Sequence, residues 1–165
     1  MSTDTLKDLY VHELRDIISA NKQMRDAMPA MVAKADDAKL KEQLQGTHDN
    51  IPNNNQKVTA ILERHGADAG NHHCRAMEGL VAEATKHAVE AEFGDPDARD
   101  VALLAQYQKL THYGITGFGT AKAYATALGD NEAAETLGKL THDMYQADEQ
   151  MSQLAERSVN LAAKG

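Results

Sequence analysis

Apolar residues recur at helical spacing along most of this chain, and that periodicity limits its fold more than any other feature of the sequence. An apolar side chain at every third or fourth position is typical of an amphipathic α-helix that buries one face. The apolar stripes are long, and Gly, Asn, Asp or Pro residues separate them. They span residues 6–31, 40–62, 101–125 and 137–161. The pattern therefore predicts four long helices and no sheet.

Capping signals predict where these helices begin and end. Asp95 before Pro96 is a typical helix start, because proline at the first helical position gives up no intrahelical hydrogen bond. Gly66 and Gly129 end the second and third long helices. The candidate N-caps of the other long helices are Thr3 or Asp4, Asp36 or Asp37, and Asp130 or Asn131.

A shorter helix is expected at residues 76–91, inside the connection between the second and third long helices. The other two connections are tight turns, which join antiparallel neighbours. One long crossover between two such pairs is the wiring of ferritin-like bundles. We therefore predict one all-α domain over residues 1–165, a ferritin-like four-helix bundle with a short extra helix in the crossover connection.

Charge and composition exclude several classes of function. The chain has 17 basic and 25 acidic residues, a net charge of −8, and no cluster of basic side chains to neutralise phosphates. Nucleic acid is therefore not an expected partner. No apolar run reaches the roughly 18 residues of a membrane span, and the N-terminus does not resemble a signal peptide. We expect a cytoplasmic protein with no membrane partner, and the single cysteine, Cys74, rules out an intrachain disulfide.

Polar or very small residues interrupt the apolar stripes near the middle of each long helix. Because all four interruptions are central, we expect them to meet in one layer of the bundle. Buried polar groups cost free energy unless they are hydrogen-bonded. The layer either fixes the helices in register or forms a functional site, and the sequence leaves both open. Its members are Asn21, Thr47, Asn50 or Ile51, Asn54, Thr111, Gly114 and Asp148.

A family resemblance is carried by four long segments: DLYVHELRDIISANKQM, CRAMEGLVAEA, DPDARDVALLAQYQKLTHYGITGFGTAKAYATALG and ADEQMSQLAERSVN. In this order they resemble the YciE/YciF family of bacterial stress-associated ferritin-like proteins, over nearly the whole chain. The resemblance implies a stress-response protein with a di-metal carboxylate site at the bundle centre. Together with the Met-rich and Ala-rich helix faces, it also implies a homodimer.

The resemblance places the family's metal-binding carboxylates at positions where this chain has none. Hard di-iron or di-manganese ions need several anionic oxygen ligands. We therefore expect no cofactor, with iron or manganese only if the ancestral site is retained in altered form. The replaced positions are Asn21, Asn50, Thr111, Gly114 and Met144.

The same replacements predict a pocket. Asn at 21 and Gly at 114 are smaller than Glu, so they empty volume in the bundle core. Pro52 removes a backbone hydrogen bond and should kink the second helix beside that volume. The candidates for lining the pocket are Asn21, Asn50, Asn54, Thr111, His112, Tyr113, Gly114, Met144 and Asp148.

Three functions stay open, and the sequence does not decide whether the chain is an enzyme. The first is a stress-associated bundle protein with a degenerate di-iron site and a polar central pocket. The second is an enzyme or binding protein that acts on a small organic molecule in that pocket. The third is a residual metal-binding, ferroxidase-like protein, although no two of its histidines form an i, i+3 or i, i+4 pair on one helix. Its candidate ligands are His48, Asp49, His112, His142 and Asp143, whereas His72 and His73 are expected to be solvated loop residues.

Overall fold

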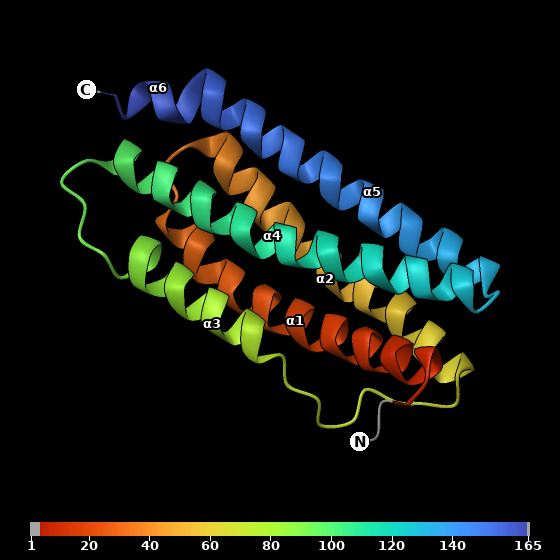
Figure 1. Ribbon diagram of the computed structural model, residues 1–165. Coiled ribbons are helices and arrows are strands. Elements are labelled where there is room, and N and C mark those ends of the chain that lie inside the picture. Colours follow the sequence, from red (N-terminus) through yellow and green to blue (C-terminus); the bar gives the residue numbers. More distant parts are fainter. Residues whose placement is uncertain (1–3, 165) are drawn as a thin grey trace.

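The computed structural model describes residues 4–164, in which every regular element is helical and there is no strand. Four long helices lie side by side and form a bundle (Figure 1). The predicted all-α bundle is confirmed. The long helices are α1 (Leu6–Lys34), α2 (Ala38–Arg64), α4 (Pro96–Ala127) and α5 (Asn131–Leu154).

Short turns join α1 to α2 and α4 to α5, so each of these pairs is antiparallel (Figure 1). The long connection from α2 to α4 carries α3 (Arg75–Ala84), which packs on α1 and α4. The short helix predicted at 76–91 is therefore confirmed, except that it ends in a π-helical turn, η1 (Thr85–Val89). After α5 the chain continues through a second π-helical turn, η2 (Ala155–Val159), into α6 (Asn160–Ala162).

The first N-cap is Thr5, so the predicted cap at Thr3 or Asp4 is wrong, with Thr3 outside the described residues. Thr5 Oγ1 accepts a hydrogen bond from the backbone N–H of Asp8, and the Asp8 carboxylate accepts one from the N–H of Thr5. This reciprocal capping box satisfies two donors at once, which a cap at Asp4 would not do. The other N-caps agree with the sequence: Asp37, Asp95 and Asp130.

The turn between α1 and α2 is anchored by Asp100, an almost fully buried carboxylate in the first turns of α4. Its two oxygens accept hydrogen bonds from the backbone N–H groups of Asp36, at 2.9 Å, and Asp37, at 2.6 Å. These donors precede α2 and have no helical partner, so Asp100 supplies the hydrogen-bond acceptors that the local sequence lacks. The contact fixes where α2 begins relative to α4.

The apolar core consists of two clusters, one toward each end of the bundle. On α2, the buried apolar residues stop at Ile51 in one cluster and resume at Val58 in the other. On α5 the interruption is longer, from Leu140 to Met151. The predicted central break in the stripes is therefore a real break in the packed core, and it positions the candidate site.

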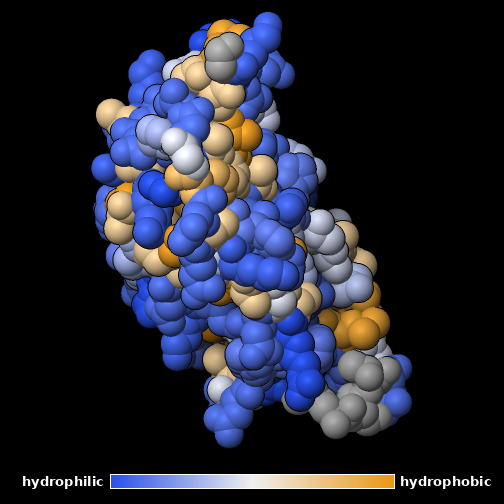
Figure 2. All heavy atoms as spheres, turned by 90° about the vertical axis from the view of Figure 1, so that its left-hand side faces the viewer, coloured by the Kyte–Doolittle hydropathy of each residue, from blue (hydrophilic) through white to orange (hydrophobic). Residues whose placement is uncertain are grey.

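The outer surface is polar where Figure 2 shows it, at the end of the bundle that carries α6. Hydrophilic residues dominate this face, and hydrophobic ones form small separate groups (Figure 2). Across residues 4–164, no helix combines the length and the apolar character that a bilayer span requires.

Candidate functional site

A cavity of about 380 Å³ lies at the break between the two apolar clusters. Helices α1 and α4 supply its floor, where Asn21, Tyr107 and Thr111 are buried. Helices α2 and α5 supply an exposed rim that includes Asn50 and Asp143. The cavity therefore opens between α2 and α5. Its volume is within the range of pockets that hold small organic molecules.

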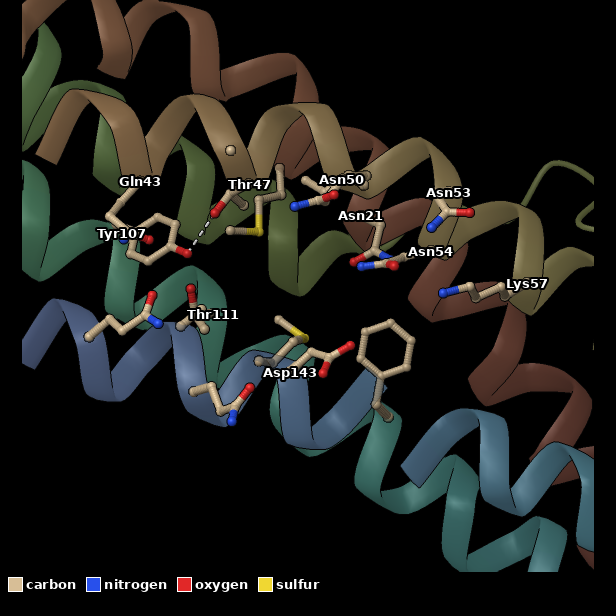
Figure 3. Close-up of a pocket in the computed structure, with 18 residues that line it drawn as sticks. Asn21, Gln43, Thr47, Asn50, Asn53, Asn54, Lys57, Tyr107, Thr111 and Asp143 are labelled. Carbon is tan, nitrogen blue, oxygen red and sulfur yellow. Dashed lines mark hydrogen bonds between the residues drawn. The ribbon is translucent and has the colours of Figure 1, made fainter. Parts of the chain in front are cut away.

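Three hydroxyl groups gather at one end of the cavity (Figure 3). Thr47 Oγ1 and Tyr107 Oη are joined by a hydrogen bond of 2.7 Å. Burial raises the pKa of Tyr107, so its phenol stays protonated at neutral pH. Thr111 Oγ1 lies near this phenol and partly offsets that rise in pKa. It nevertheless has no hydrogen-bond partner of acceptable geometry within residues 4–164, although its side chain is 1% exposed.

Asn21 lies farther along the cavity, in an amide pair that the sequence did not reveal. Its Nδ2 donates to Asn55 Oδ1 at 2.8 Å, and Asn55 Nδ2 donates to the backbone oxygen of Ile18 at 3.2 Å. The hydrogen bonds of this pair link α1 to α2. Asn55 follows two other asparagines on α2, and helical periodicity could not say which of the three faces α1.

Met144 lies against Gly114, so the volume expected to be empty at position 114 is filled. A Cβ atom on Gly114 would lie 2.5 Å from Cε and 3.0 Å from Sδ of Met144. Gly114 itself does not line the cavity, whereas Met144 does. The glycine at position 114 therefore adds no space to the cavity.

His112 and Asp148 do not line the cavity either, because they bind each other on the surface between α4 and α5. His112 Nε2 lies 3.0 Å from Asp148 Oδ2, and Gln108 Nε2 donates to Asp148 Oδ1 at 3.1 Å. Asp148 thus faces α4 and not α2. The spacing on α5 predicts that it points inward, but spacing does not say toward which neighbour.

Tyr113 also lies outside the cavity, in a cluster around Asp16 that holds the α2–α3 connection against α1 and α4. Asp16 Oδ2 accepts hydrogen bonds from Tyr113 Oη, at 2.6 Å, and from Cys74 Sγ, at 3.3 Å. Asp16 Oδ1 lies 2.9 Å from His72 Nε2, so the expectation that His72 is a solvated loop residue is wrong. His73, in contrast, is exposed and lies 3.2 Å from Glu78.

The pKa shifts of the cluster around Asp16 suit a structural role. Burial raises the pKa of the Cys74 thiol, so this cysteine is protonated at neutral pH and is a poor nucleophile. Burial also raises the pKa of Tyr113, and its hydrogen bond to Asp16 raises it further. Burial opposes the ionisation of Asp16, but hydrogen bonds from Tyr113, His72 and Cys74 outweigh it and hold the Asp16 pKa below its usual value.

The candidate metal ligands are not brought together. His48 and Asp49 bind each other at 2.9 Å on the outer side of α2, and His112 is engaged by Asp148. His142 is exposed, and Asp143 lies on the cavity rim. Residues 4–164 contain no group of three or more His, Cys, Asp or Glu side chains that could hold a metal ion.

The fold and this sequence define the chain as a member of a known protein family. Residues 5–164 match the family described as a domain of unknown function, DUF892, and the chain belongs to this family. It is 31% identical to Protein YciF of Escherichia coli (strain K12) over 169 residues, which cover 99% of this chain and 98% of YciF. The resemblance to the YciE/YciF family is therefore confirmed.

Two solved structures have the same fold. The crystal structure of the Escherichia coli stress protein YciF matches with a TM-score of 0.89 and 28% identity, over 96% of this chain and 99% of that chain. The structure of YcfI from Rhodopseudomonas palustris, a protein proposed to be structural, matches with a TM-score of 0.84 and 28% identity. That match covers 92% of this chain and 97% of YcfI.

Proposed function

We propose that this chain is a stress-associated, ferritin-like bundle protein in which a polar pocket has replaced most of the di-metal carboxylate site. The observation that carries the proposal is the chemistry of the cavity lining. Among the described residues that line it, Asp143 is the one carboxylate, and it lies on the exposed rim. Thr111 and Asn21 occupy the floor, where the family resemblance implies glutamates.

This lining does not suit a pair of divalent ions. Two hard cations need several carboxylates to balance their charge and complete their coordination. Amides and hydroxyls offer weak neutral oxygens, and Met144 offers a soft thioether. Lys57 adds a positive charge to the same lining, which opposes a bound dication. The donor set therefore supports loss of the metal pair.

The test measures metal content and oxidation together. The chain is purified without chelator, incubated with Fe²⁺ or Mn²⁺, desalted, and analysed for metal by mass spectrometry. We expect far less than two ions per chain and no oxygen consumption above that of free Fe²⁺. Two retained ions per chain, with ferroxidase turnover, would contradict the proposal and restore a metal-binding role.

A second candidate function is the binding of a small organic molecule in the same cavity. The observation in its favour is the Thr111 hydroxyl, which is buried against the cavity without a hydrogen-bond partner of acceptable geometry in the described chain. Such a group costs free energy unless something satisfies it. Incubating the protein with a bound molecule and analysing the products decides whether that molecule is also converted.

A further inference from the structure

We infer that the central cavity binds a small, uncharged molecule that carries several hydroxyl groups, of the polyol or simple sugar type. This inference rests on the proposed function, because it assigns a ligand class to the pocket left by the lost carboxylates. Four properties of the lining carry it: the hydroxyl end, the unpaired amides, the balance of charge and the apolar walls.

The hydroxyl end favours a partner that both donates and accepts hydrogen bonds. Thr111 Oγ1 lacks a hydrogen bond of acceptable geometry in residues 4–164, and it lies beside the Thr47–Tyr107 pair (Figure 3). Each of these three oxygens can donate one hydrogen bond and accept others. A ligand hydroxyl has the same double capacity, so it matches Thr111 whichever way the proton of the Thr47–Tyr107 hydrogen bond points.

Side-chain amides complete the polar lining: Gln43 and Asn54 are half-buried, and the others lie on the exposed rim. None of these side chains makes a hydrogen bond to another group of the described chain, in contrast to Asn21 and Asn55, which pair with each other. A side-chain amide presents a donor and an acceptor close together, which suits adjacent hydroxyl groups on one carbon skeleton. The unpaired amides that line the cavity are Gln43, Asn50, Asn53, Asn54, Gln146 and Gln150.

The charge of the lining favours a neutral ligand. Lys57 and Asp143 are the two charged side chains among the lining residues, and their charges cancel. No ion pair joins them within the described chain, and both are exposed at the rim. A ligand with net charge would lose its hydration on entering a cavity whose floor carries no opposite charge. Phosphorylated or carboxylated molecules are therefore poorer candidates than their neutral parents.

Apolar side chains cover the rest of the cavity surface. Met24, Ile51, Phe118 and Met144 line it, and all except Met144 are buried. These groups can pack against the C–H groups of a polyol or sugar ring while its hydroxyls face the amides. A purely apolar ligand would fill the same space but would leave the Thr111 hydroxyl and the half-buried amides of Gln43 and Asn54 without a ligand partner.

The test compares ligands that share a skeleton and differ in charge or hydroxyl content. Glucose is compared with gluconate and glucosamine, and myo-inositol with cyclohexanol. Protein with ¹³C-labelled methionine methyl groups is titrated and followed by NMR, because Met24 and Met144 report from inside the cavity. We expect glucose or inositol to shift these two methyl signals saturably, with the charged analogues and cyclohexanol at least several-fold weaker.

Two matched threonine variants locate the binding. Thr111→Val keeps the side-chain shape and removes the cavity hydroxyl, and it should weaken binding about three- to tenfold, the factor of one neutral hydrogen bond. Thr116→Val is the control on the same helix, because Thr116 is exposed and its hydroxyl donates to the His112 carbonyl oxygen. It should leave the affinity unchanged. If Thr111→Val unfolds, Asn54→Ala on the cavity wall replaces it, with the same expected loss.

The outcomes separate this inference from the proposed function. Saturable binding of only the charged analogues would overturn the neutral ligand class and leave a metal-free pocket protein in place. Neutral ligands that shift Met24 and Met144 equally in wild type and Thr111→Val would overturn the assigned binding mode. If no compound of any class shifts these signals, the inference falls and so does small-molecule binding. Loss of the metal pair is decided separately, by the metal analysis above.

Discussion

The methyl group of Met144 occupies the space that a side chain on Gly114 would need. Met144 lies on α5 and Gly114 on the neighbouring helix α4, and Met144 can pack there because position 114 has no side chain. A glycine in the middle of a helix costs roughly 0.5–1 kcal/mol relative to alanine. Here the thioether recovers packing that the missing side chain would otherwise have provided. The pair therefore forms one apolar contact at two positions where the family resemblance implies carboxylates.

This relationship predicts energetic coupling between positions 114 and 144. Gly114→Ala should change stability little in the wild type, because the gain in helix propensity is offset by displacing Met144. In a Met144→Ala background, the same change should stabilise by about 1 kcal/mol, as helix propensity alone would. Urea unfolding of the four proteins in a double-mutant cycle measures the coupling. Strictly additive effects would mean that Met144 does not rest on Gly114 in solution.

Substitution of Asp100 should lower the unfolding free energy more than substitution of most other polar residues outside the cavity. Asp100→Ala removes both acceptors of the Asp36 and Asp37 N–H groups, and we expect a loss of about 2–3 kcal/mol in unfolding free energy. Asp100→Asn keeps one acceptor oxygen of the same shape and should lose less. The measurement is chemical denaturation of both variants. An alanine variant within about 0.5 kcal/mol of the wild type would show that water replaces the carboxylate at this turn.

The sequence predicted the features that depend on local signals. Asp37 and Asp95 cap their helices as expected, because a capping side chain acts on the backbone two or three residues away. Asp100 was missed for the opposite reason. Its partners lie more than sixty residues earlier, and an acidic residue in the first turns of a helix already has an ordinary local explanation.

The candidate site was predictable only in part, for a geometric reason. Asn21 and Thr111 interrupt apolar stripes, so their periodicity placed them inside the bundle, and the structure brings both to the cavity floor. Gln146 and Lys57 lie on the rim, where a polar residue looks like any other solvated position in the sequence. Asp148 shows the remaining limit, since it belongs to an inward stripe and yet faces α4.

Acid should weaken the fold through Asp16. Because its folded-state pKa lies below the unfolded value of about 3.9, its contribution is present above that value and is lost as the pH falls through the folded-state pKa. Asp16→Asn should cost about 1–3 kcal/mol at pH 7. The difference from wild type should shrink as the pH falls below about 4 and through the lowered folded-state pKa of Asp16.

The control for Asp16 is an exposed carboxylate on the same helix. Asp26 pairs with its neighbour Arg25 on the surface, and its side chain is 55% exposed. Asp26→Asn should change stability by less than about 0.5 kcal/mol at any pH. Thermal unfolding of the three proteins across the pH range measures both effects. Equal behaviour of the two variants would mean that the cluster around Asp16 does not persist in solution.

The cavity floor should not tolerate a single restored carboxylate. Asn21→Glu breaks the amide pair with Asn55 and places an unpaired charge at a site that is 6% exposed. Such a group either takes up a proton, with a raised pKa, or destabilises the fold. We expect a loss on the order of 1–3 kcal/mol at pH 7 that Fe²⁺ does not relieve, because one carboxylate cannot hold a metal pair. Asn21→Ala is the control for the lost hydrogen bond alone.

Restoring all the implied carboxylates together should, in contrast, make the stability of the fold depend on metal. Met144→Glu removes the thioether that a side chain at position 114 would meet. Without metal, the crowded negative charges should lower the melting temperature well below that of the wild type. With Fe²⁺ or Mn²⁺ the melting temperature should rise again, because ions that bind only the folded state stabilise it. The variant combines Asn21→Glu, Asn50→Glu, Thr111→Glu, Gly114→Glu and Met144→Glu.

The melting temperature of each variant, with and without metal, tests whether these positions meet in one central layer. A neutral, metal-independent Asn21→Glu variant would mean that position 21 faces solvent. A five-fold variant that gains nothing from Fe²⁺ or Mn²⁺ would mean that these positions do not converge on one site. A large metal-dependent rise in the five-fold variant alone would show that the backbone still has the geometry of a di-metal site. The proposed loss of metal binding would then lie in the side chains alone.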